Sequence, residues 1–176
     1  MLLYITILPS LFILLYIIRS DKFPEPNHLI VKTFLLGVLL CFPAGIINTA
    51  LFSGDNYFIA GFTEEPLKFA VLYLYIKNKM DFNEPMDAIV YGTVISLGFA
   101  TLENLEYVYI LSDIYNTEPI VMAITRAITA IPLHASCGII MGFYFGLYIF
   151  RNDTKCLIYA IAIPIFVHSL YNFLAG

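Results

Sequence analysis

The sequence is poor in charged residues and has no tryptophan. Charged residues make up 12% of the 176 positions, apolar residues make up 60%, and the mean hydropathy is +0.84. Soluble domains contain about a quarter charged residues, so this composition excludes a soluble domain and predicts a single integral membrane domain over residues 1–176. No nucleic-acid partner is expected. Because tryptophan is absent, the 13 tyrosines must supply most of the aromatic belt at the lipid interface.

Cysteine is also scarce. Cys41, Cys137 and Cys156 lie in apolar segments without CxxC spacing, so neither a disulfide framework nor a cysteine metal site is expected. The first apolar run, residues 1–18, lacks a basic start and a small-residue cleavage site. It is therefore predicted to be a retained helix and not a signal peptide.

Long apolar stretches are what the chain does contain. About six are long enough to cross roughly 30 Å of hydrocarbon, so the predicted fold is an all-α polytopic membrane helix bundle. The stretches are 2–18, 32–53, 57–76, 87–111, 120–150 and 156–175. The fifth is too long for one span. Arg126 and Pro132 divide it, so we expect an interfacial or tilted helix before a span from about Ile131 to Phe150.

Basic residues mark the orientation. Seven of the nine lie in or beside the first, third and fifth loops, whereas the second and fourth loops have Asp55, Asp113 and Glu118 and no Lys or Arg. The positive-inside rule therefore places the odd-numbered loops in the cytoplasm and both termini outside. The other two basic residues, Lys68 and Arg126, lie within apolar segments and are candidate site residues.

Two adjacent carboxylates, Glu64 and Glu65, interrupt the third apolar stretch. One charge at bilayer depth costs at least about 2.5–3.5 kcal/mol, so a segment that only spans would not carry two. Glu64 and Lys68 are spaced i,i+4 in the order that favours an ion pair. Glu65 points about 100° away, and no local partner is expected for it.

Three other helices are expected to bring polar residues to the same depth. At about 1.5 Å per residue, Glu103 lies roughly 24 Å beyond Asp87. His134 precedes Arg151 by a similar length, and His168 lies roughly 18 Å along the last helix, with Asn172 one turn further. The predicted result is a cluster in the outer half of the membrane. His134 shares a stripe with Gly138, Gly142 and Gly146, which places it on a face packed against protein.

Four motifs in this order resemble the PrsW family of intramembrane proteases, within the wider group of CAAX-protease-like membrane proteins. They are Glu64-Glu65-Pro66-Leu67-Lys68, Phe99-Ala-Thr-Leu-Glu103, His134, and His168-Ser-Leu-Tyr-Asn172. They lie within residues 57–175, which form the motif-bearing core. Residues 1–18 match no motif and are expected to be an accessory helix.

The resemblance implies hydrolysis of a peptide bond in a membrane-anchored protein or peptide near the extracytoplasmic side, for example in an anti-sigma factor. Glu64, Glu65, Glu103, His134 and His168 are the expected catalytic residues, and Lys68, Phe99 and Asn172 the supporting ones. A carboxylate in an apolar pocket suits a general base that activates water. Glu65 is slightly preferred, because Lys68 is placed to hold Glu64 ionised.

Metal dependence stays open at this point. Glu103, His134 and His168 could bind one divalent metal such as zinc, or they could orient the water and stabilise the oxyanion without metal. The His-Glu-x-x-His motif is absent. Two other functions also stay open: a proton- or ion-coupled transporter, since buried Glu and His residues form proton relays, and a noncatalytic membrane scaffold. Clustering at one depth, without an inverted repeat, disfavours the transporter, and the complete set of glutamates and histidines disfavours the scaffold.

Overall fold

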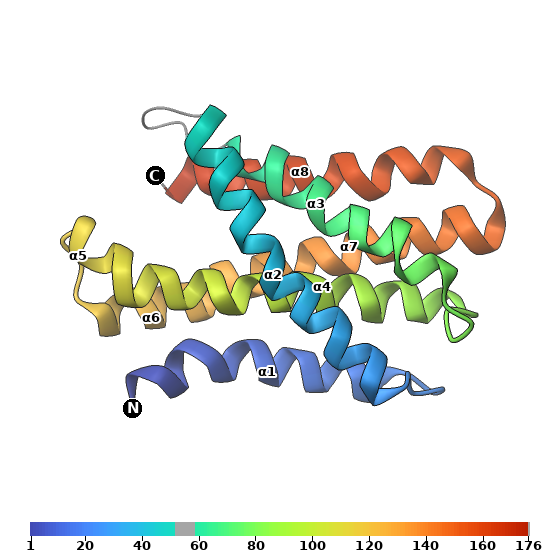
Figure 1. The fold of residues 1–176 in the computed structure, drawn as a ribbon, viewed down its shortest axis with the longest axis horizontal. Coiled ribbons are helices and arrows are strands. Elements are labelled where there is room, and N and C mark those ends of the chain that lie inside the picture. Colours follow the sequence, from blue (N-terminus) through green and yellow to red (C-terminus); the bar gives the residue numbers. More distant parts are fainter. Residues whose placement is uncertain (52–58, 176) are drawn as a thin grey trace.

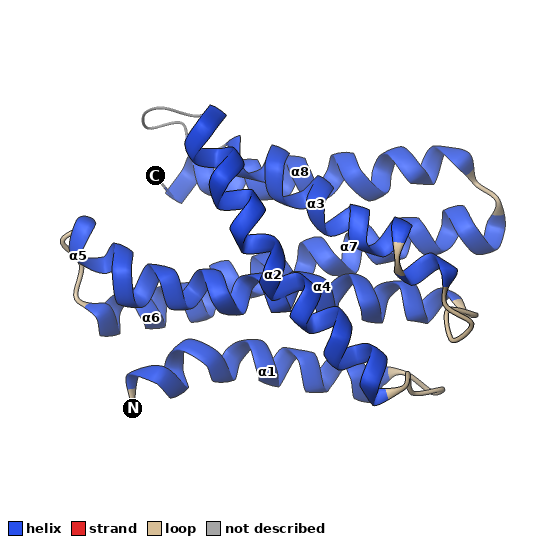
Figure 2. Cartoon of the chain, viewed as in Figure 1, coloured by secondary structure: helices blue, strands red, loops and turns tan. Residues whose placement is uncertain are grey.

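Helices form nearly all of the protein. The computed structural model describes residues 1–51 and 59–175, and within these ranges it contains no strand (Figure 2). The predicted all-α fold is confirmed. The α-helices are α1 (Leu2–Ser20), α2 (Asn27–Leu51), α3 (Ala60–Leu74), α4 (Pro85–Glu106), α5 (Ser112–Ile114), α6 (Pro119–Ile128), α7 (Ala130–Arg151) and α8 (Thr154–Ala175). A 3-10 turn, η2 (Ile76–Asn78), follows α3, and a π-helical turn, η3 (Tyr107–Leu111), follows α4.

Among the described residues, five helical stretches are long and apolar enough to cross a membrane: α1, α2, the run from α4 to α5, the run from α6 to α7, and α8. They correspond to five of the predicted spans. The remaining prediction, 57–76, is described as the 15-residue α3 followed by η2. Fifteen residues rise about 22 Å, so α3 is shorter than these five stretches. The start of this predicted span, the loop with Asp55 and the end of the second predicted span lie outside the described residues.

The long fifth stretch is divided, as predicted. α6 ends at Ile128 and α7 begins at Ala130, with Thr129 between them. α6 is amphipathic: it buries Ala123 and Arg126 and exposes Ile124 and Ile128. The break therefore lies between Arg126 and Pro132, and it lets α6 turn its one charged side chain toward the protein interior.

Successive helices run between two ends of the molecule. The N- and C-termini lie at one end, and the connections that follow α1, η2 and α7 lie at the other (Figure 1). This is the arrangement expected of a chain that crosses the membrane an even number of times. The three connections at the second end are those that the distribution of Lys and Arg assigns to the cytoplasm.

α4 is the central helix. In its most apolar stretch 78% of the residues are buried, against 17% in α8 and 22% in α1, and α4 packs on α1, α2 and α7. Glycine permits the closest of these contacts. A Cβ atom at Gly142 of α7 would lie 2.2 Å from the carbonyl oxygen of Ala88, and one at Gly138 would lie 2.6 Å from that of Gly92. The predicted packing role of this stripe is confirmed, and it brings His134 of α7 against α4.

Candidate active site

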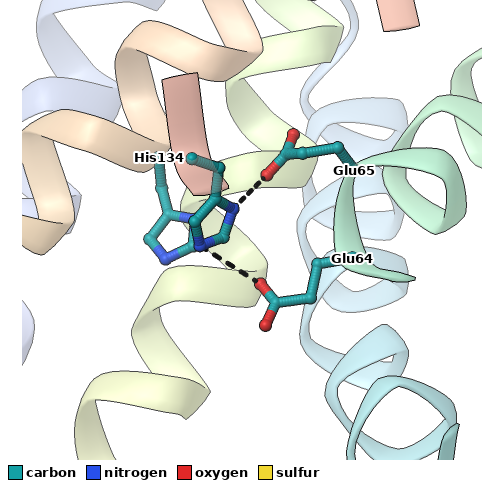
Figure 3. Close-up of side chains that lie close together, drawn as sticks. Glu64, Glu65 and His134 are labelled. Carbon is teal, nitrogen blue, oxygen red and sulfur yellow. Dashed lines mark hydrogen bonds and ion pairs between the residues drawn. The ribbon is translucent and has the colours of Figure 1, made fainter. Parts of the chain in front are cut away.

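Glu64 and Glu65 project from the second turn of α3 into the interior of the bundle. Glu64 is 4% exposed and Glu65 is 0% exposed. Figure 3 shows both carboxylates on the side of α3 that faces His134 of α7. Pro66 lies inside the helix and not at its first turn, so it cannot donate a hydrogen bond to the carbonyl of Phe62. The pair is therefore placed on a continuous helix that lacks one backbone hydrogen bond beside it, and both side chains are buried.

Lys68 contacts both glutamates, but unequally. Its Nζ donates to Glu65 Oε1 at 2.7 Å and lies 3.5 Å from Glu64 Oε2. The expectation that Glu65 lacks a local partner was therefore wrong. Residues three and four apart are both neighbours on a helix, and contacts from other helices decide which carboxylate the ammonium binds. Nζ also lies 4.2 Å from the centre of the Phe99 ring, which gives this predicted supporting residue a cation–π contact.

His168 of α8 lies against the same pair. Its Nδ1 is 2.8 Å from Glu65 Oε1 and its Nε2 is 3.9 Å from Glu64 Oε2. The ring of His168 meets the ring of His134 edge to face, with 4.9 Å between centroids. Asn172, the predicted partner one turn later in α8, is half-buried. Glu65 is thus held by Lys68 and His168 together, whereas Glu64 makes only the longer contacts.

His134 connects this cluster to Glu103 of α4. Its Nδ1 is 3.1 Å from Lys68 Nζ and its Nε2 is 2.9 Å from Glu103 Oε2. An ammonium can only donate, so Nδ1 accepts and Nε2 carries the hydrogen that Glu103 receives. The neutral imidazole therefore turns a lone pair toward Lys68 and the glutamate pair.

A chain of side chains behind Glu103 holds it in place. Arg126 of α6 donates from Nη2 to Glu103 Oε2 at 2.6 Å and from Nε to Asn104 Oδ1 at 2.8 Å. Asn104 in turn donates to the carbonyl of Thr6 in α1 at 2.7 Å. The sequence left open whether Arg126 pairs with a glutamate or anchors an interfacial helix, and the structure pairs it with Glu103. Asn104 and Thr6 were missed; only the position of Asn104 beside Glu103 could have indicated a role.

The structure therefore brings together the five residues that the sequence grouped by depth. Lys68 and Phe99, two of the predicted supporting residues, lie in contact with them. The first helix, which matched no motif, contacts the network through Thr6.

The donor set fits a divalent metal, but with a different membership from the one expected. One donor atom each from Glu64, Glu65, His134 and His168 lies within 4.8 Å of the other three. Two oxygens of this group, Glu64 Oε2 and Glu65 Oε2, are buried and have no hydrogen-bond partner among the described residues. They are therefore available to a metal ion. Glu103 is outside this group. Its contact with His134 Nε2 resembles the carboxylate that commonly orients a metal-binding imidazole.

These features define a class of protein: an integral membrane protein that encloses carboxylates and imidazoles in its helix bundle, in an arrangement suited to acid–base and metal-assisted chemistry. A family model described as "PrsW family intramembrane metalloprotease" matches residues 25–176. The curated protein named Protease PrsW from Bacillus subtilis (strain 168) is 35% identical over 96% of this chain and 79% of its own length.

Two further relatives bear the same name. Protease PrsW from Oceanobacillus iheyensis is 37% identical over 96% of this chain and 80% of its own length. Protease PrsW from Geobacillus kaustophilus is 34% identical over 94% of this chain and 76% of its own length. No solved structure matches the chain. The chain belongs to the PrsW family and is an intramembrane peptidase.

Proposed function

We propose that this peptidase hydrolyses a peptide bond of a membrane-anchored protein at the glutamate–histidine cluster. The observation that carries the proposal is the buried pair Glu64 and Glu65, whose unpartnered oxygens lie beside His134 and His168. A spanning helix gains nothing from two buried carboxylates, whereas hydrolysis needs groups that can accept and return a proton.

We assign the role of general base to Glu64. Glu65 Oε1 is bound by both Lys68 and His168, which fix that carboxylate in position. Glu64 Oε2 has no hydrogen-bond partner among the described residues and only longer contacts, so it is the carboxylate free to bind water. This reverses the sequence-based preference for Glu65, which rested on Lys68 pairing with Glu64. Glu64 would take the proton of the attacking water and return it to the leaving amide nitrogen.

We propose that Glu65, His134 and His168 hold a divalent metal, and that zinc is the ion. Two histidines and one glutamate form an ordinary zinc shell in hydrolases. When bound, zinc would lower the pKa of a bound water and polarise the scissile carbonyl. Glu103 would not be a ligand, although the sequence placed it with His134 and His168. It accepts the hydrogen of His134 Nε2 and so keeps Nδ1 available toward the cluster.

The side of cleavage follows from the proposed orientation. The cluster lies in the half of the bundle away from the connections rich in Lys and Arg, so the positive-inside rule places it toward the extracytoplasmic side of a prokaryotic plasma membrane. A membrane-anchored anti-sigma factor would be a suitable substrate. Kinship with the wider CAAX-protease-like group is inferred from the four motifs alone.

The test is cleavage of a single-pass reporter by the purified protein in liposomes. Removing a general base typically costs about 10²–10⁴-fold, so Glu64→Gln should lose activity to that extent. Glu65→Gln, His134→Ala and His168→Ala should lose it as well. Glu106→Gln is the matched control, because Glu106 is an exposed carboxylate on α4.

Chelation separates the metal assignment from the base assignment. Loss of activity on chelation, restored by zinc, supports the metal, and full activity in chelator would contradict it. Unchanged cleavage by the Glu64→Gln variant would contradict the choice of base. Unchanged cleavage by all four variants would contradict the site.

A further inference from the structure

Three carboxylates gather at the end of α4 that lies away from the glutamate–histidine cluster. Asp21 follows α1, Glu84 is the N-cap of α4, and Asp87 lies in the first turn of α4. One oxygen from each lies within 4.8 Å of those from the other two. Asp87 precedes Glu103 by sixteen residues, or about 24 Å of helix, so this group is separate from the active site.

Helix capping and a turn account for one oxygen of each aspartate. Asp87 Oδ2 accepts hydrogen bonds from the backbone N–H groups of Asn83 at 2.7 Å and Glu84 at 2.8 Å. Asp21 Oδ1 accepts from the N–H of Phe23 at 3.0 Å. These bonds satisfy free backbone donors at the start of a helix and in a turn, and they fix both carboxylates in orientation.

The second oxygen of each aspartate has no such explanation. Asp21 Oδ2 and Asp87 Oδ1 are buried and have no hydrogen-bond partner in the described parts of the chain. The two residues are 7% and 1% exposed. Leaving a buried polar atom without a partner costs about 1–3 kcal/mol, and more when it is charged. Among residues 1–51 and 59–175, no Lys, Arg or His forms an ion pair with either aspartate or with Glu84, and the nearby Lys22 is exposed.

Glu25 adds a further carboxylate near the group, and a pocket lies beside it. It is 8% exposed and accepts a hydrogen bond from the hydroxyl of Tyr91. A polar pocket of about 330 Å³ is lined in part by Glu25, Asp81 and Asn83. Its lining residues neighbour Asp21 and Glu84 along the chain, although none of the three carboxylates itself lines it.

We propose that Asp21, Glu84 and Asp87 bind a hard divalent cation, Mg²⁺ or Ca²⁺. Both ions prefer carboxylate oxygens and retain water in the remaining positions. The cation would join the connection between α1 and α2 to the start of α4. It would thereby neutralise like charges that the described residues leave unpaired. Zinc is not the expected ion here, because no imidazole or thiolate belongs to the group.

Terbium luminescence tests this site in the whole 176-residue chain in detergent. Tb³⁺ replaces Ca²⁺ at oxygen sites and is sensitised by nearby tyrosine, and Tyr91 lies beside Glu25. We expect saturable emission that excess Ca²⁺ or Mg²⁺ displaces. Since loss of even an outer partner of a metal site costs about 10–100-fold in affinity, Asp21→Asn and Glu84→Gln should each weaken Tb³⁺ binding by about tenfold or more.

The controls separate this site from the active site and from misfolding. Glu106→Gln and Glu64→Gln should leave Tb³⁺ affinity unchanged. Ca²⁺ should raise the melting temperature of the wild type and not that of Asp21→Asn, which keeps an acceptor for the Phe23 N–H. The proposal is overturned if wild-type emission does not saturate, if Asp21→Asn and Glu84→Gln bind Tb³⁺ as tightly as the wild type, or if Glu64→Gln alone abolishes the signal.

Discussion

Glu103 is the residue through which helices outside the active site influence it. Its Oε2 accepts from Arg126 at 2.6 Å and lies 2.9 Å from His134 Nε2. A carboxylate that holds an imidazole in one tautomer depends on its own partners. Arg126 is therefore a positioning residue, acting on His134 through Glu103 without touching the glutamate pair.

Replacing Arg126 should therefore lower activity although it removes no member of the glutamate–histidine cluster. We expect Arg126→Gln to reduce kcat by about 10–100-fold, the usual cost of removing an outer partner of a metal or catalytic histidine, with a smaller change in KM. Arg126→Lys should recover only part of the loss, because an ammonium cannot reproduce the two directed bonds of the guanidinium. Kinetics with the single-pass reporter measure both effects.

Arg151→Gln is the matched control, since Arg151 is exposed at the end of α7 and should leave kcat unchanged. A rise in KM without a fall in kcat would contradict the positioning role. Full activity in Arg126→Lys would also contradict it, because a positive charge without the two directed hydrogen bonds would then be sufficient.

The sequence could group the members of this cluster because charged and polar side chains are rare at bilayer depth and each requires a reason. Their pairing could not. Glu64 and Glu65 lie at i,i+4 and i,i+3 from Lys68, and both spacings allow an ion pair. His134 of α7 contacts Lys68, and His168 of α8 contacts Glu65. These contacts between helices favour the pairing of Lys68 with Glu65, and local spacing does not encode them.

At the scale of elements, the contact between α4 and α7 decides where Glu103 meets His134. The two backbones approach closely at Gly142 and Gly138, which face Ala88 and Gly92. Small residues at this spacing allow such an approach in membranes. One added methyl at Gly142 would lie 2.2 Å from a backbone oxygen, so the helices must separate to accept it.

Gly142→Ala should therefore destabilise the protein by about 1–3 kcal/mol, the range for overpacking a tight interface, and should reduce activity by shifting His134 away from Glu103. Thermal unfolding in detergent measures the first effect. Gly45→Ala in α2 is the control, because a Cβ there meets no atom within 4 Å. Equal melting temperatures for the two variants would show that the α4–α7 contact is looser than described.

The spans were predictable because the hydrocarbon thickness fixes the length of a crossing helix and because residues that interrupt a long apolar run are visible. The break in 120–150 was placed correctly on that basis. The short α3 was not anticipated, because apolar residues continue beyond Leu74 into η2 and the sequence alone does not mark where helical hydrogen bonding ends.

At the scale of the whole molecule, the two carboxylate clusters lie near opposite ends of α4. Glu103 belongs to the cluster that contacts Arg126 and the histidines, whereas Asp87 belongs to the cluster beside the α1–α2 connection. If the proposed orientation is right, the peptidase site faces the extracytoplasmic half and the cation site faces the cytoplasm. The two sites would then respond to metals from different compartments.

Cysteine labelling in intact cells determines that orientation. In a background with Cys41, Cys137 and Cys156 replaced by serine, we expect Asp113→Cys to react with a membrane-impermeant maleimide from outside. Asp153→Cys, in the connection after α7, should react only after permeabilisation. We expect this difference because Lys and Arg flank the connection after α7, whereas the loop that contains Asp113 has neither. Both positions are exposed, so a difference in labelling reports the compartment. The reverse pattern would place the glutamate–histidine cluster on the cytoplasmic side and contradict cleavage of an extracytoplasmic substrate.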